Sequence, residues 1–207
     1  MLRMTRMFGS TPRREDRLLR LLREDWDTVV ARDPSVRSRR EALLHPALPA
    51  LWAHRVAHAA HTRGYRLPAR MLMVLSRAAT GVEIHPGAVF GRRVFIDHGA
   101  AVVVGETAVV GDDVTMYHQV TLGAVGWWRD NERELDARRH PVIGNRVVLG
   151  TNATILGPLT VGAEVLVGAH AVVLDDIPGG CHVHAPPVLV RSALGGKTSN
   201  AFPPRAA

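Results

Sequence analysis

A glutamate and a histidine near the middle of the chain could together act as an acid–base pair. Glu83 lies one residue before Ile84, and His98 lies two residues after Ile96. A carboxylate that pairs with one imidazole nitrogen leaves the other nitrogen as a proton acceptor, which makes a general base. The pair could meet at a corner of the fold or across a subunit interface; the alternative is a surface histidine. Other polar residues in this part of the chain are Asp97, Arg139 and His140.

The elements that must position these residues follow a six-residue repeat. An aliphatic or other apolar residue recurs at every sixth position, first in the run Ile84, Phe90, Ile96, then after a slip of two residues at Val104, Val110, Met116 and Leu122, and again at Ile143, Leu149, Ile155, Val161, Val167 and Val173. This hexapeptide period predicts a parallel β-helix over residues 81–190, in which each coil of chain stacks on the previous one. If a coil takes three hexads, Ile84 and Ile96 lie on different flat faces of one coil.

A charged segment interrupts the repeat. From Leu122 to Ile143 the chain advances 21 positions, so residues 124–141 must leave the coil as an extended loop. Long loops on repeat scaffolds often serve a site. The adjacent Trp127 and Trp128 could cover a bound substrate or only anchor the loop.

The sequence predicts helices in the first part of the chain. Residues 1–10 are unpatterned and predict a disordered lead, and residues 11–80 predict a helical region. Thr11 and Pro12 are suited to open a helix, and Pro34 ends it. Further helices are expected near 37–45, 48–63 and 68–79, and a flexible tail over 191–207.

Composition narrows the function classes. The chain has 207 residues, a formal net charge of +7 and one cysteine, Cys181, which excludes an internal disulfide framework. No apolar run approaches the roughly 18 residues of a membrane span, and no apolar leader is evident, so we expect a cytoplasmic protein without membrane contact. The basic residues accompany no recognition motif, which argues against nucleic-acid binding. We interpret Cys181 as structural.

Four motifs together resemble the serine O-acetyltransferase family. The hexads alone are common to many acyltransferases, whereas this combination is specific. The segments that carry the resemblance are 81-GVEIHPGA-88, 94-VFIDHGAAVVVGETA-108, 120-VTLG-123 and 138-RRHPVIG-144, supported in the helical region by 32-RDPSV-36 and 53-AHRVAH-58.

The resemblance implies a left-handed parallel β-helix behind an N-terminal helical region, assembled as a homotrimer. It implies transfer of acetyl from acetyl-CoA to L-serine to give O-acetylserine for cysteine biosynthesis, without a metal or resident cofactor. By position it makes His98 the general base and Glu83 its orienting acid. It assigns the amino-acid acceptor to Asp33, Asp97, Arg139 and His140, and the CoA groove to Ala124, Thr151 and Ala169.

Departures from the family pattern keep alternatives open. The loop is longer than usual, Ala124 replaces a usual glycine, and His118-Gln119 is uncommon, so a related acyltransferase with a different hydroxy- or amino-acid acceptor is the main alternative. Docking to O-acetylserine sulfhydrylase is doubtful, because the chain ends in Arg-Ala-Ala. Two other classes are a trimeric β-helix carbonic anhydrase, with zinc ligands drawn from His85, His98, His118, His140 and His170, and a non-catalytic scaffold.

Overall fold

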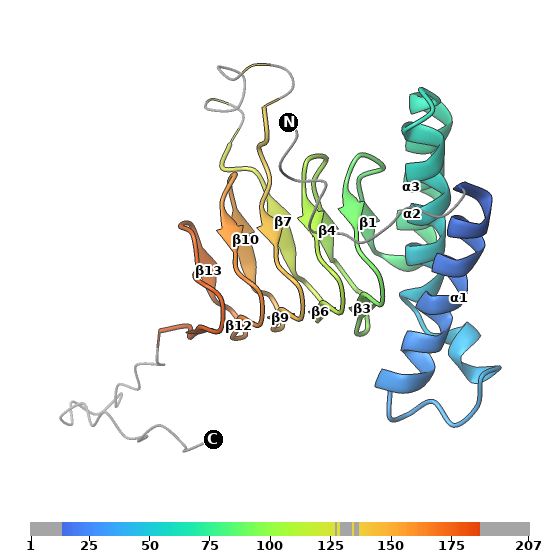
Figure 1. The fold of residues 1–207 in the computed structure, drawn as a ribbon, viewed down its shortest axis with the longest axis horizontal. Helices are drawn as coiled ribbons and strands as arrows, with labels where there is room; N and C mark the ends of the chain where they lie inside the picture. The colour runs from blue at the N-terminus through green and yellow to red at the C-terminus, as the bar shows by residue number, and fades with distance from the viewer. Residues whose placement is uncertain (1–13, 127, 129–133, 135–136, 187–207) are drawn as a thin grey trace, which may run out of the picture.

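A computed structural model describes residues 14–126, 128, 134 and 137–186, with side chains from Leu18 onward. The predicted lead over 1–10 and tail over 191–207 lie outside these residues. The described chain forms a coil of short parallel strands with a helical region at one end (Figure 1). The predicted left-handed parallel β-helix is confirmed.

The strands form three flat parallel sheets, one on each side of the coil. Sheet A contains β1 (Glu83–Ile84), β4 (Val103–Val104), β7 (Thr121–Gly123), β10 (Thr154–Leu156) and β13 (Val172–Val173). Sheet B contains β2 (Val89–Phe90), β5 (Val109–Val110), β8 (Val142–Ile143) and β11 (Thr160–Val161). Sheet C contains β3 (Phe95–Ile96), β6 (Thr115–Met116), β9 (Val148–Leu149), β12 (Leu166–Val167) and β14 (His182–Val183).

The hexad residues form the core of the coil. Each strand from β1 to β13 turns one hexad residue inward, and all thirteen residues named in the repeat are buried. Register pairs Ile84 with Val104, Val104 with Leu122, and Leu122 with Ile155, so the apolar side chains stack in rungs along sheet A. Burial of these rungs is the main stabilising contribution that a coil of two- and three-residue strands can obtain.

The corners between sheets require left-handed backbone. Arg93, Asp113, Arg146 and Glu164, which lie between sheets B and C, have φ values of 54–62°. Between sheets C and A, the non-glycine residues with positive φ are His98, Ala101, Gln119, Asn152 and His170. Non-glycine residues adopt this conformation at a cost, and such residues cluster at functional sites when the surrounding structure holds them.

In the part of the chain that the structure describes, three α-helices and one 3-10 helix cover one end of the coil (Figure 1). They are α1 (Arg14–Arg32), η2 (Glu41–Leu44), α2 (Leu48–His61) and α3 (Arg66–Thr80). α3 begins two residues before the expected start, because Pro68 lies in the first turn, where backbone N–H groups need no helical partner. The helix expected over 37–45 is only the short η2. Gly81, with φ of 72°, ends α3 in the left-handed conformation.

A buried arginine joins the helices to the first coil. Arg55 of α2 forms two hydrogen bonds to the Asp25 carboxylate of α1, at 3.2 and 3.0 Å. The same guanidinium donates to the carbonyls of Phe90 and Gly91 at 2.9 and 2.8 Å. Burial raises the pKa of Asp25, while Arg55 opposes the shift. Within the described residues, no helix is long and apolar enough to span a membrane.

Candidate active site

The predicted site residues occupy two different corners of the coil. The segments that lead from sheet C to sheet A, here called the CA corner, carry Asp97, His98, Thr151 and Ala169. The segments that lead from sheet A to sheet B, here called the AB corner, carry Ala124, Arg139 and His140. The CA corner lies where the strands of sheet A begin, and the AB corner lies where they end. The described chain therefore does not bring all the predicted residues together.

His98 is presented by the two-residue slip in the repeat. His98 and Gly99 have φ values of 61° and 79°, so the backbone is left-handed at both residues between β3 and β4. A Cβ on Gly99 would approach Val82 Cγ2 to 2.9 Å and Ala47 Cβ to 3.0 Å, so only glycine fits this turn against the start of α2. The His98 side chain is 72% exposed, and its Nε2 lies 3.8 Å from Asp97 Oδ1.

The helical region adds an aspartate beside this corner. Arg32 donates to Asp113 Oδ1 at 3.2 Å and to Thr115 Oγ1 at 3.0 Å, which holds the turn after α1 against the coil. The next residue, Asp33, accepts hydrogen bonds from the Ser35 hydroxyl at 2.7 Å and from its N–H at 2.8 Å. These bonds, with smaller contributions from His45 and His98, hold the pKa of Asp33 below its usual value.

Two further histidines lie at the CA corner. His45 is buried, with Nε2 3.8 Å from Asp33 Oδ2, and burial lowers its pKa even though Asp33 and Asp97 favour the charged form. His118 meets His98 edge-on, with ring centroids 5.8 Å apart. His45 lies just after η2 and gives no periodic signal in the sequence. Only its charge interactions in the fold reveal it as part of the site.

Glu83 lies close to this corner but has another partner. Its backbone N–H donates to the Val102 carbonyl at 2.9 Å, which places it beside the turn that carries His98. Its carboxylate forms an ion pair with Arg77 Nη1 of α3 at 2.7 Å. His98 has the Asp97 carboxylate 3.8 Å from its Nε2, and orientation of His98 by Glu83 stays a prediction.

The AB corner brings the basic residues together. Arg139 Nη2 donates to Glu106 Oε2 at 2.8 Å, and the other Glu106 oxygen accepts from Arg66 Nη2 at 3.3 Å. His140 is buried and packs on Gly105, where a Cβ would lie only 2.0 Å from the ring. Gly105 is therefore required for the ring to occupy this position.

His85 completes the AB corner. Its Nε2 contacts Arg70 of α3, and its Nδ1 accepts the Gly87 N–H at 3.0 Å. Burial lowers the pKa of His85 to about 4, and Glu106 opposes the shift. No residue type or spacing gave Glu106, Arg66 or Arg70 a role beforehand, because their contacts join segments far apart in the sequence. His85 entered the sequence analysis only as a zinc ligand of the carbonic anhydrase alternative.

The base of the long loop is tied to the next coil. Arg138 donates to the Pro158 carbonyl at 2.6 Å and to the Leu159 carbonyl at 3.3 Å. At the other end, Val125 Cγ2 lies against Gly157. Trp128 packs over Gly126 and is 58% exposed, whereas Trp127 lies outside the described residues.

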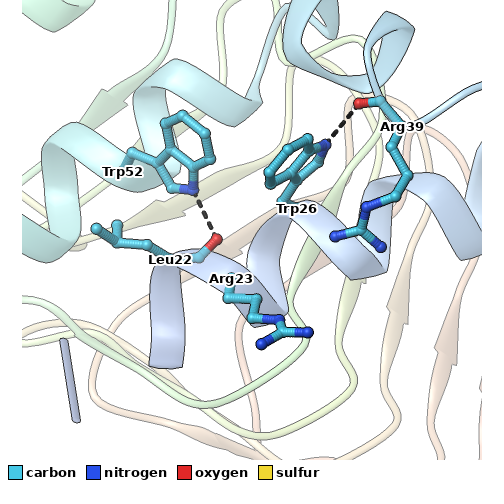
Figure 2. A pocket seen from close by; sticks show the side chains of 5 residues that line it. All are labelled: Leu22, Arg23, Trp26, Arg39 and Trp52. Carbon is cyan, nitrogen blue, oxygen red and sulfur yellow. Dashed lines mark hydrogen bonds between the residues drawn. The ribbon is translucent and has the colours of Figure 1, made fainter. Parts of the chain in front are cut away.

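A hollow of about 650 Å³ lies on the helical region, away from both corners. Figure 2 shows its lining, with the indole N–H groups of Trp26 and Trp52 donating to the carbonyls of Arg39 and Leu22 at 2.8 and 2.9 Å. None of the predicted site residues lines it. Within the described residues, no group of three or more His, Cys, Asp or Glu side chains could hold a metal ion.

Comparison with known proteins decides the family. Residues 140–175 match the bacterial transferase hexapeptide (six repeats) family model. The serine acetyltransferase of Helicobacter pylori strain 26695 is 50% identical over 155 residues, which are 74% of this chain and 86% of that protein. The chain belongs to the serine acetyltransferase family. The resemblance carried by the sequence motifs is thereby confirmed.

Other relatives extend the comparison. The serine acetyltransferase of Mycobacterium tuberculosis is 46% identical over 162 residues, covering 78% of this chain and 68% of that one. The structure of Neisseria gonorrhoeae serine acetyltransferase in complex with serine has a TM-score of 0.75 at 32% identity, covering 83% of this chain and 68% of that chain. Entamoeba histolytica isoform 3 in complex with cysteine has a TM-score of 0.74 at 33% identity, and this chain covers 86% of its own length and 63% of the Entamoeba chain.

Proposed function

We propose that this protein transfers acetyl from acetyl-CoA to the hydroxyl of L-serine, giving O-acetylserine for cysteine biosynthesis. The observation that carries the proposal is the pair of corners. A histidine flanked by Asp97 and Asp33 lies where the strands of sheet A begin, and Arg139 with His140 lies where they end. Family membership and the serine-bound Neisseria relative support serine as the acceptor. We also propose a cytoplasmic location, on the single cysteine.

The charges of the two corners match a zwitterionic amino acid. Asp33 and Asp97 would receive the α-ammonium group, because ionised carboxylates are its natural acceptors. The planar guanidinium of Arg139 would receive the α-carboxylate, and its five N–H donors allow it to keep Glu106 at the same time. An acceptor bound in this way places its side-chain hydroxyl between the corners, within reach of His98.

The chemical step is a direct transfer. An unprotonated nitrogen of His98 takes the proton of the serine hydroxyl while the oxygen attacks the thioester carbonyl carbon. The resulting tetrahedral species collapses, the carbon–sulfur bond breaks, and the thiolate of CoA takes the proton from His98. Help from a positioned general base is typically about 10²–10⁴ in rate, and alignment of the two substrates contributes further.

The residues expected to line the CoA arm are compatible with a path along the coil. Thr151 and Ala169 lie on successive coils of the CA corner, where the His170 N–H donates to the Thr151 carbonyl at 2.8 Å. His118 lies one coil below, and its carbonyl accepts the Asn152 N–H at 3.0 Å. Ala124 lies at the AB corner, directly after β7. The CoA arm would thus run between the CA corner of one subunit and the AB corner of another.

We infer a closed homotrimer with active sites between subunits. In a closed ring of identical subunits each contact joins two different surfaces. The CA and AB corners, at opposite ends of the strands of sheet A, are two such surfaces. α3, which contacts β1 of sheet A, exposes an apolar stripe suited to burial near the ring axis. The stripe consists of Leu67, Met71, Val74 and Leu75, which are 57–72% exposed in the single chain.

Release of the CoA thiol tests the proposal directly. Purified protein should release CoA from acetyl-CoA with L-serine. Ethanolamine, which lacks the carboxylate, and 3-hydroxypropionate, which lacks the ammonium group, should react far more slowly, since a site built to bind a polar group rejects analogues without it by up to about 10⁴–10⁵. Release with another hydroxy-amino acid but not with L-serine would move the assignment to the related acyltransferase.

A further inference from the structure

The most informative feature not yet used is the hydrogen bonding of Thr107 at the AB corner. Its hydroxyl oxygen accepts the backbone N–H groups of Arg139 at 2.9 Å and of His140 at 3.1 Å. The same oxygen lies 2.9 Å from His140 Nδ1. The backbone N–H of Thr107 donates to that nitrogen at 3.1 Å. Thr107 therefore binds the backbone of Arg139 and His140, the two residues expected to contact the acceptor, and also the ring of His140.

These contacts determine where the proton of His140 resides. A hydroxyl has one hydrogen to donate and two lone pairs to accept with. Two backbone N–H groups, which can only donate, occupy both lone pairs of Thr107 Oγ1. The hydroxyl hydrogen must therefore point to His140 Nδ1. The backbone N–H of Thr107 points to the same nitrogen, so both hydrogens share the single lone pair of Nδ1, and Nδ1 carries no proton. In a neutral imidazole the proton then lies on Nε2.

We propose that Thr107 is a positioning residue that holds His140 as the Nε2–H tautomer, so that His140 serves as a hydrogen-bond donor and not as a base. This inference rests on the proposed function, in which a second histidine lies opposite His98. A histidine with Nδ1 engaged and Nε2 protonated cannot take the hydroxyl proton, but it can donate to a negatively charged oxygen of the bound acceptor or acetyl group. The roles of the two histidines are thereby divided.

The surrounding corner supports the same division. Gly105 leaves the space that the His140 ring occupies, and Glu106 holds the Arg139 guanidinium. Three consecutive residues, Gly105 to Thr107, thus form a cradle for Arg139 and His140 as the chain returns from the long loop. The loop can vary in length without moving the two side chains, because both are held by the coil on which they rest.

The tautomer can be measured without activity. Nitrogen-15 NMR of protein labelled at histidine, with the His140 signals assigned by their loss in His140→Gln, should show at neutral pH an unprotonated Nδ1 and a protonated Nε2. A His140 that is protonated on Nδ1, or on both nitrogens, would overturn the proposal. Because this readout needs no turnover, it is independent of whether serine is the acceptor.

Substitution tests the consequence for catalysis. Thr107→Val keeps the shape but removes the hydroxyl. By analogy with the loss of hydrogen-bond partners that orient metal-bound histidines, we expect kcat/KM to fall about 10- to 100-fold. Thr107→Ser should restore most of the loss. Thr160→Val, at an exposed position of sheet B, is the matched control and should leave activity unchanged. Full activity of a folded Thr107→Val protein, or no rescue by serine, would refute the role.

Discussion

The division of the site between two corners predicts that two inactive variants can restore each other. His98→Ala disables the CA corner, and Arg139→Ala disables the AB corner. If the site forms within one chain, no subunit in a mixture of the two variants carries both functional corners. If it forms between neighbours, a contact between the intact CA corner of an Arg139→Ala subunit and the intact AB corner of a His98→Ala subunit is a complete site.

The size of the effect follows from counting contacts. In an equal random mixture each contact has an intact CA corner in half of the cases and, independently, an intact AB corner in half, so about one quarter of the sites should be complete in a closed ring. The mixture should therefore show about a quarter of the wild-type turnover, while each variant alone stays at its residual level.

The assay uses oligomers assembled by co-expressing equal amounts of the two variants and purified through a tag that both variants carry, so that unmixed oligomers remain and the random count applies. A second mixture provides the control. Wild type combined with the double variant His98→Ala/Arg139→Ala should give about one quarter of the activity if sites are shared, but about one half if each chain is self-sufficient. Mixed oligomers no more active than their parents, together with half activity in the control, would refute the shared site.

Three further predictions follow from the geometry. His98→Ala should lower kcat by at least about 10², while Glu83→Gln should lower it less because the imidazole remains; steady-state kinetics on the correctly folded protein measures both. The unfolding free energy should fall as pH drops from 6.5 toward 4, because burial keeps His54 and His85 neutral in the folded protein while they become protonated in the unfolded chain. The slope is at most about 1.4 kcal/mol per pH unit for His54 and less for the partly exposed His85, and His54→Asn should flatten the melting temperature between pH 7 and pH 5. Trp128→Ala should raise KM for acetyl-CoA with little change in melting temperature if the loop is a lid, whereas unchanged CoA affinity would favour the anchor interpretation.

The repeat made the coil predictable residue by residue. Six-residue spacing places one apolar side chain on each flat face, and the structure buries every one of them. The slip between Ile96 and Val104 was visible in the sequence as two extra residues. The slip leaves His98 and Gly99 with left-handed backbone. This turn depends on the packing of Gly99 against Ala47 of the helical region, which no local sequence pattern encodes.

The grouping of the candidate residues was less predictable. Counting hexads assigns His98 to the corner after sheet C and Arg139 to the corner before sheet B, so the division between corners is contained in the repeat. The partners of each residue are not. Glu83 pairs with Arg77, and Arg139 pairs with Glu106, because side chains from α3 and from neighbouring coils reach these positions. Such contacts depend on the tertiary fold and leave no periodic trace.

The separation of the corners also explains how a site with opposite charges can avoid neutralising itself. If Asp97 and Arg139 shared one corner, they would form an ion pair that a zwitterionic acceptor would have to break. Because the two corners lie at opposite ends of the strands of sheet A, the charged residues of each corner have their own partners. Asp33 is held by Ser35, and Arg139 is held by Glu106 with donors to spare. In the proposed ring the acceptor then bridges two preformed halves, so its binding adds hydrogen bonds without first breaking those between the halves. Charge reversal at Glu106 offers the complementary check: Glu106→Lys should repel Arg139 and weaken acceptor binding, while acetyl-CoA affinity stays close to that of the unmodified protein.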